Sequence, residues 1–229
     1  GIAVAGTHGK TTTTSLIAEI LLSAGLDPTF VVGGLVKSAQ GSARLGDGDY
    51  LVAEADESDS SFLHLHPLVA VITNIDADHL DAYDGDFDQL IRTFDEFLKR
   101  LPFYGLAILC ADDPVLQDLR KRLSNPVVTY GTGSDADYRA VDIRQEGRRM
   151  YFYLCMPGEP YVAVELALAG KHNVLNALAA VGIAHQLGVG IDPILKALAQ
   201  FQGVDRRFEV LGEVVIGRGK ALLVDDYAH

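Results

Sequence analysis

The sequence has no tryptophan, only two cysteines and no long apolar run. Cys110 and Cys155 fit no metal-ligand spacing, and so few cysteines favour a reducing compartment over a disulfide-stabilised secreted domain. No apolar stretch approaches the roughly 18 residues that span a bilayer, and no signal peptide is present. We therefore expect a cytoplasmic protein with no membrane partner.

Basic residues are also scarce. Lys and Arg total 19 against 31 Asp and Glu, a net charge of −12. Without a basic stripe to neutralise phosphates, we expect no nucleic-acid partner. With 229 residues and 48% hydrophobic content, the chain can bury the core of one large domain. It starts without Met inside a predicted strand and stops directly after another, so we expect a piece of a longer protein.

A glycine-rich turn opens the sequence. The apolar run Ile2 to Ala5 is typical of a buried strand, and Lys10 to Ala24 has the periodicity of a helix. Between and after them stand Gly6-Thr7-His8-Gly9 and Lys10-Thr11-Thr12. Such a turn points backbone N–H groups at an anion, Lys10 adds positive charge, and the Thr11 hydroxyl is placed to hold magnesium.

The spacing of this motif departs from the usual G-x-x-x-x-G-K-[ST], because Val4 stands where the first glycine would be. Gly9-Lys10-Thr11 alone could be a helix start with an exposed lysine. The strand before it and the helix after it favour a nucleotide site.

Polar residues follow the ends of other predicted strands. The strand Tyr50 to Ala53 ends on Glu54, and the strand Leu68 to Thr73 leads to His79. Ligands of open α/β sheets bind beyond the carboxyl ends of strands, so we interpret Glu54 as a magnesium-associated carboxylate. His79 can reach the same cluster; zinc is disfavoured because neighbouring His or Cys ligands are absent. Three other acids are interpreted as surface residues: Asp56, Glu57 and Asp59.

The order of elements predicts the fold. A P-loop α/β domain is expected, with a doubly wound, mostly parallel sheet and helices on both faces. The further strands and helices are Thr29 to Val32, Phe87 to Leu98, Leu106 to Cys110, a short helix from Pro114, and Val127 to Tyr130, with a loop from Gly33 to Gly48. Alternation within 137–168 predicts a small antiparallel β-sheet, whose hairpin joins Arg148–Met156 to Tyr161–Leu168.

The last third of the chain adds more polar candidates. A helix from Gly170 to Leu187 carries Asn173 and Asn176 on one face, where they either cap the helix or read a base edge. After a helix from Ile191 to Phe201, a polar loop carries Arg206-Arg207. Two final strands enclose Gly217-Arg218-Gly219 and lead to Asp225-Asp226-Tyr227.

Six strings occur in one order, and together they resemble the central ATP-binding domain of the Mur ligases, a family that makes peptidoglycan precursors. The resemblance covers essentially all of residues 1–229. The strings are Gly6-Thr7-His8-Gly9-Lys10-Thr11-Thr12, Glu54-Ala55-Asp56-Glu57-Ser58-Asp59, Thr73-Asn74-Ile75 with Asp78-His79, His172-Asn173 with Asn176, Arg206-Arg207-Phe208, and Asp225-Asp226-Tyr227.

The resemblance implies an amide-forming reaction. ATP phosphorylates the carboxylate of UDP-N-acetylmuramate, and an amino-acid amine then displaces phosphate. His8, the acidic string and Leu101-Pro102-Phe103-Tyr104-Gly105 are most similar to the members that add L-alanine. The implied roles are these: Lys10 balances phosphate charge, Thr11, Glu54 and His79 hold Mg²⁺, Asn173 and Asn176 contact adenine, Arg207 the γ-phosphate and Asp226 the ribose.

Two departures from the family pattern bear on mechanism. Several relatives carry a carbamylated lysine in the helix after the Asp-His loop, whereas Phe87 to Leu98 contains none. The UDP-binding and amino-acid-binding domains are missing, so we expect these residues alone to form no amide. Two rivals stay open: the ligase that attaches a recycled tripeptide, and a nucleotide-binding regulatory module. A GTPase is disfavoured, since no Asn-Lys-x-Asp element is present.

Overall fold

The computed structural model describes residues 1–37, 41–58, 60–78, 80–205, 209–216 and 219–226. Within these ranges, no helix is both long and apolar enough to cross a bilayer.

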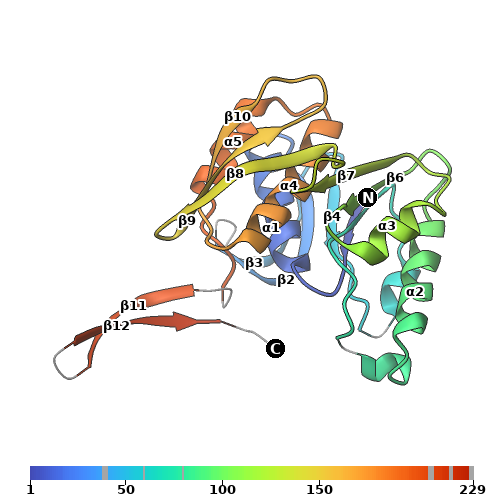
Figure 1. Ribbon diagram of the computed structural model, residues 1–229, viewed down its shortest axis with the longest axis horizontal. Helices are drawn as coiled ribbons and strands as arrows, with labels where there is room; N and C mark the ends of the chain where they lie inside the picture. The colour runs from blue at the N-terminus through green and yellow to red at the C-terminus, as the bar shows by residue number, and fades with distance from the viewer. Residues whose placement is uncertain (38–40, 59, 79, 206–208, 217–218, 227–229) are drawn as a thin grey trace.

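The described strands form one large sheet and one small one (Figure 1). The large sheet has the order β10-β9-β8-β7-β6-β5-β1-β4-β2-β3, and its neighbours from β8 across to β2 are parallel. This confirms the predicted mostly parallel sheet. Its strands are β1 (Ile2–Ala5), β2 (Thr29–Val36), β3 (Gly41–Arg44), β4 (Leu51–Glu54), β5 (Val69–Ile72), β6 (Leu106–Cys110), β7 (Val127–Gly131), β8 (Tyr138–Glu146), β9 (Arg149–Cys155) and β10 (Val162–Leu166).

Helices cover both faces of this sheet, as predicted. One group packs together over the central strands, and a second group lies on the opposite side (Figure 1). The first group is α1 (Lys10–Ser23), α4 (Lys171–Gln186) and α5 (Ile191–Gln200); the second is α2 (Phe87–Lys99) and α3 (Pro114–Arg120). Short 3₁₀ helices, η1 (Ser61–His64) and η2 (Leu80–Tyr83), precede α2.

Aspartates start both helices of the second group. The Asp86 carboxylate accepts hydrogen bonds from the Asp88 and Gln89 amides at 2.9 and 3.2 Å. Asp113 does the same for the Leu116 amide at 2.9 Å. An oxygen acceptor at this position satisfies N–H groups that have no partner within the helix.

The predicted loop from Gly33 to Gly48 is wrong. β2 continues to Val36, and β3 pairs with it in antiparallel register, with an irregularity between Val31 and Val36. Gly34 lies in this irregular stretch, where an added Cβ would sit 2.8 Å from Val204 Cγ1. The glycines therefore mark a close approach of the β2 backbone to side chains of other segments rather than the end of a strand.

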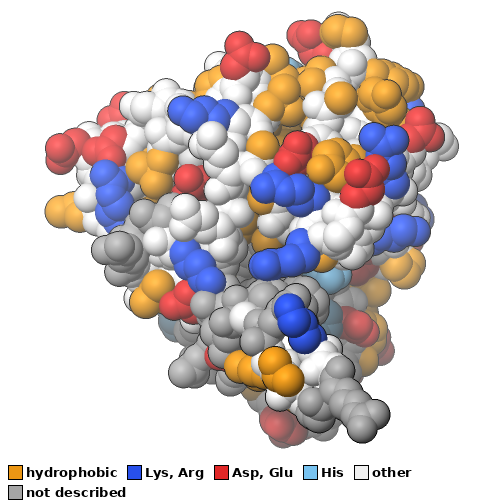
Figure 2. All heavy atoms as spheres, turned by 90° about the vertical axis from the view of Figure 1, so that its left-hand side faces the viewer, with side chains coloured by type: hydrophobic (Ala, Val, Ile, Leu, Met, Phe, Trp, Pro, Cys, Tyr) orange, Lys and Arg blue, Asp and Glu red, His pale blue; other side chains and the backbone are white. Residues whose placement is uncertain are grey.

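The predicted hairpin within 137–168 is confirmed, because β9 and β10 pair antiparallel with Phe152 opposite Val164. Its strands join the large sheet, since β8 pairs with both β7 and β9. A separate antiparallel pair is formed by β11 (Glu209–Ile216) and β12 (Gly219–Asp225). Figure 2 views the molecule from the side on which β11 and β12 lie. Basic, acidic and hydrophobic side chains are mixed on this face.

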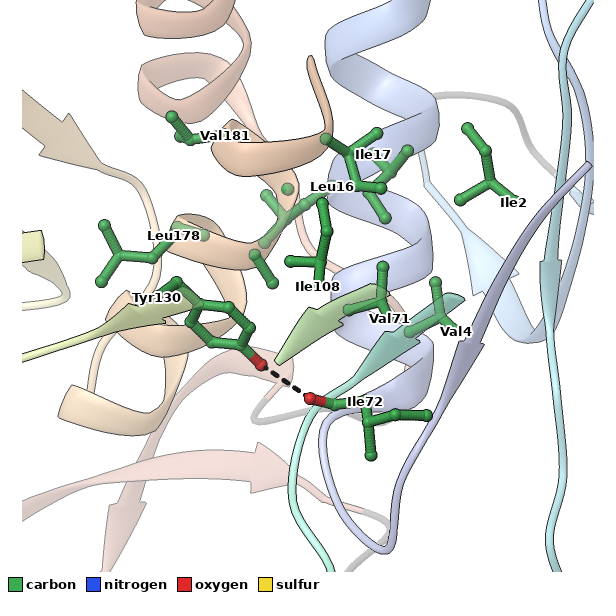
Figure 3. Close-up of a cluster of buried hydrophobic side chains, with 14 of the residues drawn as sticks. Ile2, Val4, Leu16, Ile17, Val71, Ile72, Ile108, Tyr130, Leu178 and Val181 are labelled. Atoms are coloured by element: carbon green, nitrogen blue, oxygen red, sulfur yellow. Dashed lines mark hydrogen bonds between the residues drawn. The ribbon is translucent and has the colours of Figure 1, made fainter. Parts of the chain in front are cut away.

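One part of the core lies between the central strands and the helices α1 and α4 (Figure 3), and another part is contributed by α2 and α3. All four residues of β1 are buried, which explains why its sequence is a continuous apolar run instead of an alternating one. Tyr130 is fully enclosed and donates its hydroxyl hydrogen bond to the Ile72 carbonyl at 3.4 Å. Burial raises the pKa of this hydroxyl well above its usual value, so it stays a neutral donor.

Candidate functional site

A cavity of about 940 Å³ opens at the carboxyl ends of β1 and β4. β1 has β4 on one side and β5 on the other, so the direction of chain crossover changes here. Open α/β sheets bind ligands at such a point. The cavity is lined by Thr7, His8, Gly9, Lys10, Thr11, Thr12, Glu54, Asp56, Ser58, Asp78, Gln145, Arg148, Ala167, Leu168, Ala169, Gly170, His172, Asn173, Asn176, Phe201, Gly203, Val204 and Asp226.

Two positions of the turn after β1 require glycine. Gly6 has φ +129°, and a Cβ there would lie 2.1 Å from Thr73 Oγ1. Gly9 has φ +84°, and its Cβ would lie 2.5 Å from Asn176 Oδ1. Both backbones are in a conformation that other residues rarely adopt. The turn can therefore pack directly against the end of β5 and the start of α4.

The turn is held in place by the residues that follow β5. The Asn74 carbonyl accepts from the Thr7 amide at 3.0 Å, and the Asn74 side chain both accepts from the His8 amide at 2.8 Å and donates to the His8 carbonyl at 2.9 Å. Thr73 Oγ1 donates to the same carbonyl at 2.6 Å. This network fixes the turn before any ligand arrives, which lowers the entropy lost on binding.

Helix α1 begins at Lys10 with its amides directed to the cavity. Gly9 occupies the N-cap position and has no side chain with which to cap the helix. The first N–H groups of a helix have no partner within it, and they carry the positive end of the helix dipole. This helix start is therefore suited to an anion.

Lys10 bends back over the turn. Its Nζ donates to the Gly6 carbonyl at 2.9 Å and to both carboxylate oxygens of Glu57, at 3.0 and 2.8 Å. The Asp56 carboxylate is farther away, at 3.9 Å, and mostly exposed. The ammonium group thus lies beside the cavity with three acceptors around it.

The interpretation of Glu57 as a surface acid is wrong. The residue is only 2% exposed. Burial raises the pKa of its carboxyl, while the nearby Lys10 charge acts in the opposite direction. Sequence reasoning missed this residue because its environment depends on a contact with Lys10, 47 positions away. Its place in an acidic string gave no signal that separates it from Asp56.

Thr11 and Glu54 are in direct contact. The Thr11 hydroxyl donates to Glu54 Oε1 at 3.0 Å, and the Gly33 amide donates to Glu54 Oε2 at 2.6 Å. A hydroxyl and a carboxylate are the oxygen ligands that Mg²⁺ prefers. In the described part of the chain, no three His, Cys, Asp or Glu side chains are grouped to hold a metal, either here or elsewhere. His79 lies outside the described residues.

The asparagines of α4 join this helix to α1. Asn176 Oδ1 accepts from Thr13 Oγ1 at 3.2 Å, and its amide donates to Asn173 Oδ1 at 3.1 Å. Asn173 in turn donates to the Ala169 carbonyl at 2.7 Å. Both asparagines line the cavity, and Asn176, which is 7% exposed, also acts as a structural link between the two helices.

Other cavity residues were not predicted from the sequence. Gln145 near the end of β8 and Arg148 in the turn before β9 both line the cavity. Leu168, Phe201 and Val204 provide an apolar surface. These residues meet only through the tertiary fold, so no local pattern identifies them. Two predicted residues remain: Asp226 does line the cavity, whereas Arg207 lies outside the described residues.

Helix α2 contributes no lysine to this cavity. It extends one residue beyond the predicted end, to Lys99, whose Nζ pairs with Asp95 at 2.5 Å on an exposed turn. The absence of a lysine between Phe87 and Leu98 therefore stands as a departure from the pattern of several relatives.

Comparison with known proteins gives one consistent result. The model of the Mur ligase middle domain matches residues 4–184. A UDP-N-acetylmuramate–L-alanine ligase of Xylella fastidiosa (strain M12) is 58% identical over 230 residues, which cover all of this chain. The crystal structure of a UDP-N-acetylmuramate-alanine ligase from Thermotoga maritima superposes with a TM-score of 0.83 at 32% identity, over 99% of this chain and 50% of that one.

A second type of ligase is also similar. The UDP-N-acetylmuramate:L-alanyl-gamma-D-glutamyl-meso-diaminopimelate ligase from Neisseria meningitides has a TM-score of 0.79 and 32% identity, over 90% of this chain and 67% of that one. This chain spans about half the length of the curated relative, 48% of the Xylella protein.

Proposed function

Because the chain belongs to the Mur ligase family and carries its middle domain, we propose that it is the ATP-binding part of a UDP-N-acetylmuramate–L-alanine ligase. One observation carries the proposal: the glycine turn, Lys10 and Thr11 face a cavity at the switch point of the sheet. The 58% identity to an alanine-adding ligase supports the choice of member.

The proposed reaction has two steps. The carboxylate of UDP-N-acetylmuramate attacks the γ-phosphorus of ATP and forms an acyl phosphate, with ADP as the leaving group. The amine of L-alanine then attacks the acyl carbon and loses a proton, an amide forms, and inorganic phosphate leaves with the acyl C–O bond broken. Phosphoryl transfer of this kind requires positioning and charge neutralisation, which are what this cavity offers.

The helix start and Lys10 would hold the phosphates. The start of α1 has no side-chain cap at Gly9, which leaves its N–H groups for an anion, and Lys10 supplies a full positive charge within the same turn. The network through Asn74 keeps the turn rigid. Together these groups would orient the β- and γ-phosphates toward the open part of the cavity.

The site also fits Mg²⁺. Thr11 and Glu54 would hold the ion, with His79 as the family resemblance implies, and the ion would neutralise phosphate charge. Glu54 is oriented for this by the Gly33 amide, which occupies its other oxygen. Thr11 and Glu54 are already in contact, so a small movement would admit an ion between them.

The far end of the cavity would take the nucleoside. Leu168 and Phe201 are apolar lining residues of the kind on which a base packs, and Asn173 lines the same cavity. Following the family resemblance, we assign adenine to Asn173 and Asn176, the ribose to Asp226 and the γ-phosphate to Arg207. The remaining length of the relatives would supply the sites for the sugar nucleotide and for alanine.

We place this reaction in the cytoplasm. Both cysteines are buried free thiols, which suits a reducing compartment. Burial raises the pKa of Cys110 to about 11, so its thiol stays protonated.

The test is an assay of the full-length protein with UDP-N-acetylmuramate, ATP and Mg²⁺, in which amide product and phosphate are followed together. With L-alanine, we expect one phosphate released for each amide formed. Faster turnover with the tripeptide L-alanyl-γ-D-glutamyl-meso-diaminopimelate would identify the protein as the second type of ligase. Phosphate release without amide from either amine would instead indicate a regulatory nucleotide-binding module.

A further inference from the structure

Among the described side chains around the proposed phosphate site, Glu57 is the only buried acid, and the proposed reaction does not use it. Lys10 is 14% exposed by side chain and Glu57 is 2% exposed, so the pair lies almost entirely out of water. Buried ion pairs contribute little to stability relative to apolar residues of similar volume, because both charges must be desolvated. A stabilising role alone therefore explains this pair poorly.

The geometry around Lys10 Nζ is saturated. An ammonium group has three N–H donors, and three acceptors stand within 3.0 Å: the Gly6 carbonyl and the two Glu57 oxygens. A phosphate oxygen can receive a hydrogen bond from Lys10 only if one of these acceptors gives way. Glu57 thus accepts hydrogen bonds from Lys10 that a phosphate oxygen would otherwise receive.

The backbone of Glu57 is also fixed by hydrogen bonds. Its backbone carbonyl accepts a hydrogen bond from the Ser60 amide at 3.1 Å and another from the hydroxyl of Tyr83, a residue that is 1% exposed. Three residues earlier, Glu54 contacts Thr11, the neighbour of Lys10. The end of β4 and the segment that follows it therefore supply two carboxylates to the helix start: Glu54 contacts Thr11, and Glu57 contacts Lys10.

Resting on the proposed function, we propose that Glu57 is a positioning residue that holds Lys10 as a counter-anion and yields it in part to the nucleotide phosphates. In the nucleotide-free site it keeps the ammonium at the turn. With nucleotide bound, one Glu57 oxygen is exchanged for a phosphate oxygen, and the other continues to orient Lys10. The residue acts on the reaction through Lys10 and does not itself touch the phosphates.

This role has a distinctive signature. Glu57→Gln keeps the shape but removes a negative charge that competes for Lys10, so Mg–ADP should bind about three- to tenfold more tightly. The same change leaves Lys10 less precisely oriented, so kcat should fall about tenfold or more while the KM for ATP does not rise. If the role of Glu57 were purely structural, Glu57→Gln would lower Tm. The Kd for Mg–ADP and the kcat per folded molecule would then stay unchanged.

The experiment compares wild type, Glu57→Gln and Asp56→Asn in the full-length protein. Asp56→Asn removes the same charge one residue away, from a carboxylate that is mostly exposed and 3.9 Å from Lys10, so its effect on kcat should be much the smaller. Titration calorimetry with Mg–ADP gives Kd, the amide assay gives kcat and KM, and thermal unfolding gives Tm. Glu57→Asp should recover most of the kcat that Glu57→Gln loses.

Two results would overturn the proposal. One is a Kd and a kcat for Glu57→Gln within twofold of wild type; the other is weaker Mg–ADP binding with kcat unchanged. If Glu57→Gln does not fold, Tyr83→Phe carries the test, because it frees the Glu57 backbone while both charges stay: kcat must fall without a rise in the Kd for Mg–ADP. Wild-type protein that binds Mg–ADP but forms no amide would contradict the proposed function, and the Kd comparison would still decide the role of Glu57.

Discussion

The central parallel strands and the antiparallel strands β8 to β10 bury their residues in different ways. β1 is buried at every position, and β5 and β6 are buried at all but their first. In β9, buried residues such as Met150, Phe152 and Leu154 alternate with more accessible ones such as Tyr153. The difference follows from the helices. They cover both faces of the central strands but only one face of strands β8 to β10, which we call the extension.

This comparison separates the residues that would carry the proposed chemistry from those that only enclose the cavity. The central strands bring their carboxyl ends to one edge, where Lys10, Thr11 and Glu54 converge. The antiparallel strands add Gln145 and Arg148 to the wall of the same cavity but place no side chain on the helix start. Substitutions at the central edge should therefore reduce turnover without unfolding the protein. Substitutions of buried residues in the extension should lower the free energy of unfolding and leave the site of the folded protein intact.

The largest effect on turnover is expected from Lys10→Ala. Amide formation by the full-length protein should fall by about 10³- to 10⁵-fold, the range found for residues that stabilise charge on a transferring phosphoryl group. Tm should also fall, because the buried Glu57 carboxylate loses its partner, so turnover is compared per folded molecule. Lys121→Ala, which breaks an exposed pair with Asp118, is the matched control. An unchanged rate would remove Lys10 from the mechanism, and loss of the unfolding transition would make its role structural.

The largest effect on stability is expected in the extension. Phe152 is 3% exposed, and Phe152→Ala should lower the free energy of unfolding by about 3–5 kcal/mol through lost burial and a cavity. Urea unfolding measures this loss. Mg–ADP affinity, corrected for the folded fraction, should stay within about twofold of wild type. A tenfold loss of affinity would show that the two regions are coupled and would break the comparison.

Asn176→Ala should affect both properties, because Asn176 links α4 to α1 beside the cavity. It leaves the Thr13 hydroxyl and Asn173 without their partner, at a cost of about 1–3 kcal/mol. Weaker adenine-nucleotide binding should accompany this loss. Asn173→Ala, at the more accessible position, should weaken binding with a smaller change in Tm. Normal binding by both variants would refute the assignment of adenine to α4.

The smallest effect is expected at the surface of the extension. Arg149 pairs with Glu165 in a half-exposed position, and exposed pairs contribute about 0–1 kcal/mol. Arg149→Gln should therefore shift the urea midpoint only slightly and leave turnover unchanged. A loss above about 2 kcal/mol would mean that this pair, and not apolar burial, stabilises the hairpin.

Local patterns were sufficient to predict the turn and much of the sheet. The strand, the glycines and the helix around Lys10 are adjacent in sequence, so the site could be recognised without knowledge of the fold. Glu54 was found because it ends a strand. Glu57 was missed because its burial depends on the path of a loop, and Gly33 because a glycine pair resembles a turn even where it lies within β2.

The central claim is that the edge of β1 and β4 binds nucleotide phosphates and Mg²⁺. A crystal structure of the full-length protein with Mg²⁺ and a non-hydrolysable ATP analogue tests it most directly. We expect the phosphates over the start of α1, one hydrogen bond from Lys10 to a phosphate oxygen, and the metal between Thr11, Glu54 and the phosphates. Nucleotide bound elsewhere, with Lys10 and Glu54 turned away from it, would contradict the account.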